Sequence, residues 1–502
     1  MNTLRILALG FVLLAIQAPA ADITGNWLAR APRSDGTSRD TYLNLKQEGS
    51  RMTGSIRFTQ FYYRIVESTG GADGFTIIGS MMDGRNERRV TYEGKLVGDE
   101  LRVGTRARPD AALAEMVAHR APAGEGALPA RVAPPPLHRV PDNGLAKTPP
   151  MGWNSWNKFA GRVDDAAVRG MADAMASNGM KEAGYQYINI DDTWESGRDA
   201  QGNITTNKKF PDMKALADYV HGKGLKIGLY SSPGPNTCAG YEGTYGHEEQ
   251  DARTYAAWGI DYLKYDWCGA RNLYSDDEMQ AVYQKMGDAL HNAGRPILYS
   301  LCQYGRADVW KWGAEVGGNA WRTTGDIRDS WDSMTRIGFS QDALAPWAKP
   351  GHWNDPDMLE IGNGGMTEVE YKTHMSLWSI LAAPLLAGND LRSMTPGITE
   401  ILTNRDVIAV NQDPDGKQGR RIAKSGDQEV WSRPLSGGAQ AVGLFNRAAE
   451  AATITVKWSD VGIKPAGARD LWTHRDVTLS GAEYSVEVPP HGVVLLRVRG
   501  TQ

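Results

Sequence analysis

The feature that most constrains the fold of this chain is the alternation of strand and helix patterns between residue 150 and about residue 412. The expected strands are apolar and end near eight positions, which are Trp153, Ile190, Tyr230, Tyr265, Leu301, Trp321, Trp353 and Leu386. Amphipathic patterns typical of helices lie between them, such as the one that follows Asp164,. Eight strand–helix units in about 260 residues is the size of one closed (β/α)8 barrel. We therefore predict a multidomain protein whose central domain, residues 148–413, is a TIM barrel.

In the segments before and after the expected barrel, apolar and polar residues alternate with the two-residue period of β-strands. In residues 21–120, alternating apolar positions such as Leu43 and Leu45 are separated by Gly- and Asp-rich turns,. We predict an antiparallel β domain there, a sandwich or a barrel, and its role as a sugar-binding accessory or a structural cap stays open. Residues 121–147 are rich in proline and predict an extended linker,. Residues 414–502 alternate again, over 453–458, 484–488 and 493–498, which predicts a C-terminal antiparallel β-sandwich,.

The first twenty residues have the pattern of an export signal. Arg5 supplies the positive charge, residues 6–15 are almost wholly apolar, and residues 18–20 form a small-residue cleavage site,. We expect the mature chain to begin near Ala21 and to be secreted or periplasmic. Three cysteines in such an oxidising compartment allow at most one intramolecular bridge, and their spacing does not choose the pair,.

Composition narrows the class of ligand. A net charge of −4 argues against nucleic acid, whose binding proteins usually concentrate basic residues on one surface,. No other apolar stretch is long enough to cross a bilayer, so no membrane partner is expected. Sixteen Trp and nineteen Tyr against eight Phe suit stacking on the C–H faces of sugars, although they also suit an ordinary core,.

The predicted strands bring acidic and aromatic residues to one place, because the active site of a TIM barrel lies at the carboxyl ends of its strands. These residues are Trp153, Trp156, Asp191, Asp192, Trp194, Tyr230, Lys264, Asp266, Cys268, Cys302, Gln303, Tyr304, Arg322, Asp326, Asp355, Asp357 and Met358. Two carboxyl groups about 5–5.5 Å apart are what a retaining glycosidase needs, one as nucleophile and one as proton donor. Lys264 lies two residues before Asp266 on one strand and would favour its ionised form.

Plainer interpretations of the same residues remain open. An aspartate at a strand end often forms a turn or caps a helix. The triplet from Asp355 to Asp357 fits a turn or a metal site, but the nine His residues offer no zinc-like pairing,. We therefore expect neither a metal nor a cofactor.

Six ordered motifs carry a resemblance to glycoside hydrolase family 27, the family of lysosomal and plant α-galactosidases. They are Thr148-Pro-Pro-Met-Gly-Trp-Asn-Ser-Trp-Asn157, Ile188-Asn-Ile-Asp-Asp-Thr-Trp194, Lys226-Ile-Gly-Leu-Tyr-Ser-Ser-Pro-Gly234, Leu263-Lys-Tyr-Asp-Trp-Cys268, Trp321-Arg-Thr-Thr-Gly-Asp-Ile327 and Trp353-Asn-Asp-Pro-Asp-Met358. The resemblance spans residues 145 to about 500 and leaves residues 22–135 outside. It implies a TIM barrel followed by a β-sandwich, and hydrolysis with retention of the anomeric configuration.

The resemblance also implies roles for single residues. Asp266 resembles the family's nucleophile and Asp326 its general acid/base. The expected contacts with galactose are Asp191 and Asp192 on the 4- and 6-hydroxyls, Lys264 on O3 and O4, Arg322 on the 2-hydroxyl and Trp156 beneath the ring, with Tyr230, Cys302, Gln303, Tyr304 and Met358 lining the same pocket. The family's disulfide beside the nucleophile matches Cys238 and Cys268, which leaves Cys302 as a free thiol.

Two departures from the family pattern bear on specificity. Plant-like members read Ser-Leu-Cys-Glu-Trp-Gly where this chain reads Ser300-Leu-Cys-Gln-Tyr-Gly305. Cys302 and Tyr304 are bulkier than the small residues that admit a 2-acetamido group, which favours an unsubstituted 2-hydroxyl. Thr193 stands where many relatives have Cys, so a second disulfide is absent.

We predict hydrolysis of terminal α-D-galactosyl residues from galactose-containing oligosaccharides, polysaccharides or glycoconjugates. The alternatives are a β-L-arabinopyranosidase or an α-N-acetylgalactosaminidase on the same scaffold, and a sugar-binding protein without activity. The natural aglycone and the oligomeric state are left open by the sequence.

Overall fold

The computed structural model describes residues 22–83, 86–105 and 112–501. The expected export signal, residues 1–20, lies outside them. The described residues form two compact units, of which one comprises those up to Ala31 and from Ser38 to Ala127, and the other Pro32–Thr37 and those from Leu128 onward. Among the described residues, no helix has both the length and the apolar character needed to span a membrane.

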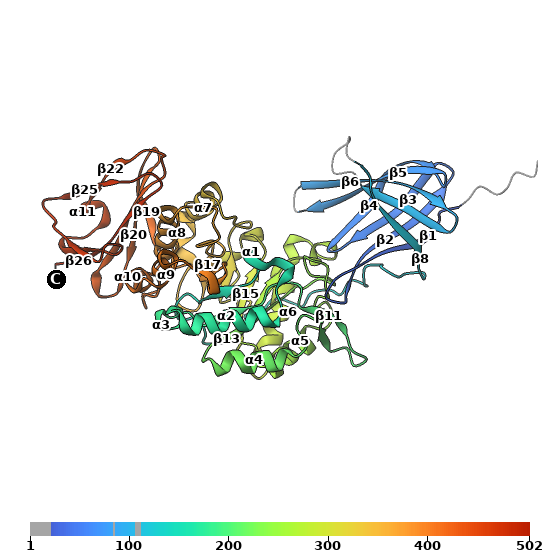
Figure 1. The fold of residues 1–502 in the computed structure, drawn as a ribbon, viewed down its shortest axis with the longest axis horizontal. Helices are drawn as coiled ribbons and strands as arrows, with labels where there is room; N and C mark the ends of the chain where they lie inside the picture. Colours follow the sequence, from blue (N-terminus) through green and yellow to red (C-terminus); the bar gives the residue numbers. More distant parts are fainter. Residues whose placement is uncertain (1–21, 84–85, 106–111, 502) are drawn as a thin grey trace, which may run out of the picture. The chain divides into compact units, whose positions relative to one another are not determined.

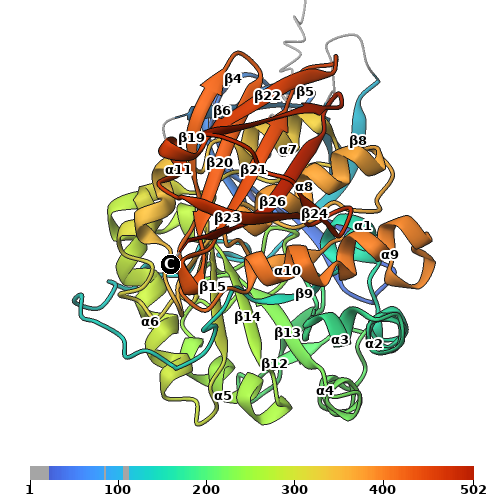
Figure 2. The same ribbon diagram turned by 90° about the vertical axis from the view of Figure 1, so that its left-hand side faces the viewer.

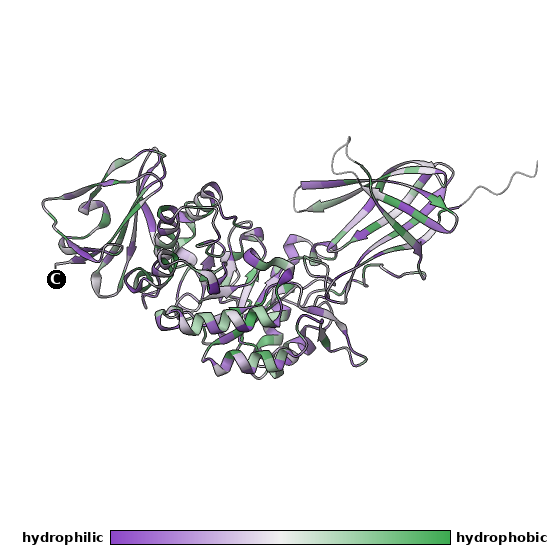
Figure 3. Cartoon of the chain, viewed as in Figure 1, coloured by the Kyte–Doolittle hydropathy of each residue, from purple (hydrophilic) through white to green (hydrophobic). Residues whose placement is uncertain are grey.

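The first unit is a closed antiparallel barrel of eight strands (Figure 1). The strands are β1 (Gly25–Pro32), β2 (Ser38–Glu48), β3 (Arg51–Phe58), β4 (Phe61–Gly71), β5 (Gly74–Asp83), β6 (Asn86–Val97), β7 (Glu100–Thr105) and β8 (Ala114–Arg120). Pairing of Trp27 in β1 with Arg120 in β8 closes it. Alternate residues such as Trp27, Leu43 and Leu45 point into its core, and hydrophobic and hydrophilic segments alternate along these strands (Figure 3). The predicted β domain is therefore a barrel.

The second unit contains the predicted parallel barrel. Its strands lie in the order β17 (Trp353–Asp355), β16 (Ala320–Arg322), β15 (Leu298–Cys302), β14 (Tyr262–Asp266), β13 (Lys226–Ser231), β10 (Tyr187–Asn189), β9 (Met151–Asn154) and β18 (Leu385–Ala387). Leu359, just after β17, bridges to Ala387 in β18 and joins the two ends of the sheet. All eight predicted strand ends fall within or next to these strands, which confirms the TIM-barrel class.

Helices connect and cover these strands. They are α1 (Trp156–Phe159), α2 (Asp165–Ser177), α3 (Met180–Ala183), α4 (Met213–Gly222), α5 (Glu248–Trp258), α6 (Met279–His291), α7 (Trp331–Gly338), α8 (Glu368–Ile380), α9 (Pro396–Thr403) and α10 (Arg405–Asn411). The Asp164 carboxylate caps α2 by accepting the Ala167 N–H,. Strand β15 is followed by a short 3-10 segment, because Ala307 and Asp308 have positive φ and interrupt the helix. A hairpin of β11 (Glu195–Arg198) and β12 (Ile204–Thr206) is an addition that periodicity did not predict.

The C-terminal part is an antiparallel sandwich of a six-stranded and a two-stranded sheet. The larger sheet holds β19 (Arg420–Ser425), β20 (Gln428–Pro434), β21 (Gln440–Asn446), β23 (Pro465–Asp470), β24 (Arg475–Val477) and β26 (Val493–Gly500), and the smaller holds β22 (Ala452–Lys457) and β25 (Glu483–Val488). The expectation that a strand continues to Trp458 is wrong, since Trp458 begins the one-turn helix α11 (Trp458–Val461). Trp431 and Phe445 share one hydrophobic core with α8, and the sandwich overlies that helix in Figure 2.

Candidate active site

The residues predicted at strand ends gather at the carboxyl end of the central barrel. Register pairs Asp266 in β14 with Cys302 in β15, and Arg322 in β16 with Asp355 in β17. Since the strands are parallel, these ends open onto one mouth. Within a few residues of a strand's carboxyl end lie Trp156, Asp191, Asp192, Tyr230, Lys264, Asp266, Cys302, Gln303, Tyr304, Arg322, Asp326 and Met358.

Asp266 is the last residue of β14 and is 4% exposed. The Tyr304 hydroxyl lies 2.8 and 3.0 Å from its two carboxylate oxygens and donates to them. Burial raises the pKa of Asp266 to about 6, although the Lys264 charge and the Tyr304 hydrogen bond act in the opposite direction,. The charges of Asp326 and Asp191 add to this rise. A poorly solvated carboxylate of this kind is a competent nucleophile once it is ionised.

Asp191 forms the first ion pair of the mouth. Its Oδ2 lies 2.8 Å from Lys264 Nζ and also accepts from Asn154 Nδ2 at 2.8 Å. Burial alone would lower the pKa of Lys264, but Asp191 and the other anionic groups around it raise that pKa well above its ordinary value,. The ammonium group therefore stays charged, and with three N–H donors it keeps hydrogen bonds for a ligand beyond this ion pair.

Asp192 is held by the loop that follows β13. The Thr237 hydroxyl donates to its Oδ1 and the Ala239 N–H donates to its Oδ2, both at 2.7 Å. Burial raises the pKa of Asp192 to about 7, because it outweighs these two hydrogen bonds, and the charges of Asp191 and Asp266 add to the rise. The conformation of this loop therefore decides where the Asp192 carboxyl lies and how it ionises.

Arg322 connects the other side of the mouth. Its Nη2 lies 2.8 Å from Asp357 Oδ2 and 3.2 Å from Asp326 Oδ1, and its Nη1 donates to Cys302 Sγ at 3.6 Å. The side chain of Arg322 is 4% exposed, whereas that of Asp326 is 71% exposed. The mouth thus combines a buried carboxylate, Asp266, with an exposed one, Asp326.

Three predicted residues keep polar atoms without a partner among the residues that the structure describes. The atoms are the Tyr230 hydroxyl, both polar atoms of the Gln303 side chain and Arg322 Nε. Burial raises the pKa of Tyr230 well above its ordinary value, so its hydroxyl remains a neutral donor. Trp156 is half-buried at the start of α1 and Met358 is buried after β17. Buried polar atoms without partners are costly, and a bound ligand with hydroxyl groups can satisfy them.

Sequence reasoning missed the side chains that fix these groups. It did not identify Asn154 or Thr237, and it placed Asp357 at the mouth without its ion pair to Arg322. Asn154 lies inside the first quoted motif at a strand end, so a signal existed for it. Thr237 offered none, because its partner Asp192 is 45 positions away in the chain.

The cysteines lie beside the mouth. The structure joins Cys238 to Cys268 by a disulfide and leaves Cys302 as a buried free thiol. The bond ties the loop that carries Thr237 to the turn after β14. Among the described residues, the grouping of metal-ligand side chains is Cys238, Asp266 and Cys268. Its two sulfurs are bonded to each other and are therefore not thiolate ligands.

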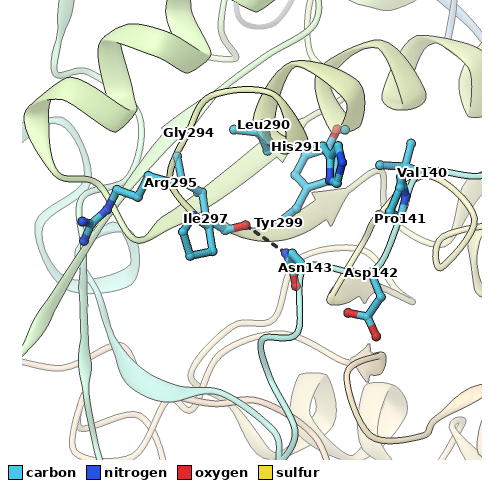
Figure 4. Close-up of a pocket in the computed structure, with 13 residues that line it drawn as sticks. Val140, Pro141, Asp142, Asn143, Leu290, His291, Gly294, Arg295, Ile297 and Tyr299 are labelled. Atoms are coloured by element: carbon cyan, nitrogen blue, oxygen red, sulfur yellow. Dashed lines mark hydrogen bonds between the residues drawn. The ribbon is translucent and has the colours of Figure 1, made fainter.

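A cavity of about 330 Å³ lies at the opposite, amino end of β15. Residues 140–143, the end of α6 and the segment before β15 line it (Figure 4). Asn143 Nδ2 donates to the Ile297 carbonyl at 3.1 Å and to Asn319 Oδ1 at 2.8 Å, so this side chain anchors the linker to the barrel. None of the predicted site residues lines this cavity, which is separate from the mouth.

Comparison with known proteins agrees with this geometry. The family model for Alpha galactosidase A matches residues 148–413, and that for the Alpha galactosidase C-terminal beta sandwich domain matches residues 425–498. The alpha-galactosidase of Cyamopsis tetragonoloba is 50% identical over 357 residues, which are 70% of this chain and 86% of that protein. The structure of alpha-galactosidase I from Mortierella vinacea superposes with a TM-score of 0.69 at 37% identity, over 72% of this chain and 99% of that one. A β-L-arabinopyranosidase from Geobacillus stearothermophilus gives a TM-score of 0.63 at 28% identity, over 70% and 96%.

The disulfide determines how many thiols should react before reduction, and its removal should lower the stability of the protein. Of the three cysteines, we expect one to react with a thiol reagent in the denatured, unreduced protein and all three to react after reduction. The double variant Cys238→Ser/Cys268→Ser should unfold at lower temperature, with a loss of about 3–4 kcal/mol, because the bond closes a loop with a sequence separation of 30,.

The control for the thiol count is Cys302→Ser, which should leave no reactive thiol before reduction. Three reactive thiols in the unreduced wild-type protein would contradict the assignment.

Proposed function

Because the chain belongs to the alpha galactosidase A family, we propose that it is a retaining exo-glycosidase that hydrolyses terminal α-D-galactosyl residues. Its substrates are galactose-containing oligosaccharides, polysaccharides or glycoconjugates. The observation that carries the proposal is the buried Asp266 carboxylate, which accepts a hydrogen bond from the Tyr304 hydroxyl and whose pKa is lowered by the Lys264 charge, at the same mouth as the exposed Asp326.

In the first step, the ionised Asp266 carboxylate attacks C1 of the galactosyl residue. A bond forms between a carboxylate oxygen and C1, and the bond from C1 to the glycosidic oxygen breaks. Asp326, in its acid form, gives its proton to that oxygen, and the aglycone leaves as an alcohol. The exposure of Asp326 suits contact with a leaving group that lies outside the pocket.

In the second step, the Asp326 carboxylate takes a proton from a water molecule, and the water oxygen attacks C1. The ester bond to Asp266 breaks, and galactose leaves with the α configuration that it had in the substrate. Each carboxyl group thereby returns to its starting protonation state.

The sugar ring is held by groups that are already charged or unpaired. Asp191 and Asp192 accept hydrogen bonds from the 4- and 6-hydroxyls, and Lys264 donates to O3 and O4. Arg322 binds the 2-hydroxyl, and Trp156 stacks beneath the ring. Around them, Tyr230, Cys302, Gln303, Tyr304 and Met358 line the pocket, and the unpartnered atoms of Tyr230 and Gln303 support this arrangement.

We further propose that the protein acts outside the cytoplasm, as a secreted or periplasmic enzyme. This rests on the export pattern of residues 1–20, with Arg5 before an apolar run and small residues at 18–20,.

A panel of nitrophenyl glycosides tests the activity and its specificity. We expect kcat/KM for the α-D-galactoside to exceed that for the β-L-arabinopyranoside by at least about tenfold, because the arabinoside lacks the hydroxymethyl group that hydrogen-bonds the site. The α-N-acetylgalactosaminide should be the poorest, since Cys302 and Tyr304 crowd the 2-position. Preference for the arabinoside, or no hydrolysis of any member, would overturn the proposed function.

Azide distinguishes the roles of Asp266 and Asp326, because their glycine variants should give different azide products. Asp266→Gly should lower kcat by about 10⁴-fold or more and yield β-galactosyl azide when azide is added, because azide attacks from the vacated face. Asp326→Gly should yield α-galactosyl azide, because azide then attacks the galactosyl-enzyme. Product configuration is read by NMR, and the same anomer from both variants would refute the assignment.

The pH profile tests the hydrogen bond on the nucleophile. Asp266 must be ionised to attack, so kcat/KM should fall as the pH drops through about 6. The Tyr304 hydroxyl stabilises the carboxylate, and its removal in Tyr304→Phe raises the pKa of Asp266,. The acid limb of Tyr304→Phe should therefore lie at higher pH than that of the wild-type enzyme. An unmoved acid limb would show that Tyr304 does not act on Asp266.

A further inference from the structure

A short segment from the N-terminal part of the chain packs against the barrel mouth. Residues Pro32–Thr37 connect β1 to β2, yet they belong to the same compact unit as the central barrel. They lie outside the residues that match either family model. The segment is a closed turn, in which the Arg33 N–H donates to the Thr37 carbonyl at 2.9 Å.

Arg33 contacts the loop that holds Asp192. Its Nη2 donates to the Ala239 carbonyl at 2.7 Å, and its guanidinium lies 3.9 Å from the centre of the Tyr241 ring. The N–H of the same residue, Ala239, is the donor to Asp192 Oδ2. Ala239 therefore links Arg33 to Asp192, because its carbonyl accepts from Arg33 and its N–H donates to Asp192.

Asp35 leads to the second of these hydrogen bonds. Its Oδ2 accepts from the Tyr241 hydroxyl at 2.5 Å. The Tyr241 N–H donates to Thr237 Oγ1 at 3.0 Å, and this hydroxyl donates to Asp192 Oδ1 at 2.7 Å. The two relays thus begin at Arg33 and Asp35 and end at the two oxygens of Asp192.

Asp35 also reaches the other flank of Asp192, through Lys209. Lys209 Nζ lies 4.0 Å from Asp35 Oδ2 and donates to the hydroxyl of Thr193, the residue that follows Asp192, at 2.7 Å. Gly36 has a φ of +86°, a left-handed conformation that favours glycine in this turn,.

Asp35 is a fixed anionic anchor. It is 4% exposed, and its Oδ1 accepts from the N–H and the hydroxyl of Thr37. Burial would raise the pKa of Asp35, but the hydrogen bonds from Thr37 and Tyr241 and the charge of Lys209 lower that pKa below its ordinary value. The carboxylate stays ionised at the pH at which the site works.

We propose that the Pro32–Thr37 segment is a positioning element for Asp192 and that it strengthens recognition of the 6-hydroxymethyl group of the sugar. Asp191 is already paired with Lys264, which is assigned to O3 and O4, so Asp192 is the aspartate left for the 6-hydroxyl. A 1 Å displacement of a binding group is enough to weaken turnover markedly. The proposal rests on the α-galactosidase activity proposed above.

The test measures substrate preference rather than activity alone. Arg33→Ala should lower kcat/KM for nitrophenyl α-D-galactoside about tenfold, mainly by raising KM, and should leave nitrophenyl β-L-arabinopyranoside nearly unchanged. Asp35→Ala should act in the same direction, and the double variant should lose little more than either single variant, because both act through one loop.

The matched control is Arg30→Ala. Arg30 is 58% exposed and pairs with Asp40 inside the N-terminal barrel, so both substrates should keep their wild-type kinetics. If Asp35→Ala does not fold, because it leaves the Tyr241 hydroxyl buried without a partner, Arg33→Ala alone decides. An unchanged galactoside-to-arabinoside ratio in Arg33→Ala, with or without a general loss of activity, overturns this inference. Absence of galactosidase activity in the wild type overturns the proposed function instead.

Discussion

The barrel mouth depends on ion pairs and hydrogen bonds that stabilise its buried carboxylates. Asp191, Asp192 and Asp266 are each at most 4% exposed, and isolated charges at such depth are costly,. The barrel meets this cost in three ways, with the Lys264 ammonium on Asp191, hydrogen bonds from a loop on Asp192, and the Tyr304 hydroxyl on Asp266. Removing one partner would leave a buried charge uncompensated, so these groups form one interdependent set.

Backbone strain lies beside the same carboxylates. Three non-glycine residues with positive φ are at the mouth, namely Thr193 at 88°, Tyr304 at 63° and Asp357 at 99°. Each one orients a polar group, since Thr193 accepts a hydrogen bond from Lys209, Tyr304 donates to Asp266 and Asp357 pairs with Arg322. Such conformations persist where surrounding contacts enforce them. Stability is therefore given up locally where the sugar binds.

The sequence predicted features that depend on neighbouring residues, and it did not predict contacts between residues that are far apart in the chain. Strand ends such as Asp266 and Arg322 were predictable because strand periodicity is local and a parallel barrel places all carboxyl ends on one face. The disulfide pair and the individual roles came only from the family resemblance. The contacts of Thr237 and of the Pro32–Thr37 segment were not predictable, because they depend on loop conformations that join distant parts of the chain. Trp458 was assigned to a strand since its apolar character fits either a strand end or a helix start.

The same burial that makes the site costly also makes it responsive to the sugar. Burial raises the pKa values of Asp192 and Asp266 to about 7 and about 6, so both carboxyl groups hold their protons more tightly than exposed ones would. Sugar hydroxyls are donors, and a donor stabilises the ionised form and lowers the pKa of the carboxyl that it binds. In the proposed role of Asp192 as an acceptor for a sugar hydroxyl, substrate binding lowers the pKa of Asp192 and favours its ionised form. A ligand that lacks the proposed hydroxyl leaves only the Thr237 and Ala239 hydrogen bonds to oppose the burial of Asp192, so desolvation would contribute to selectivity.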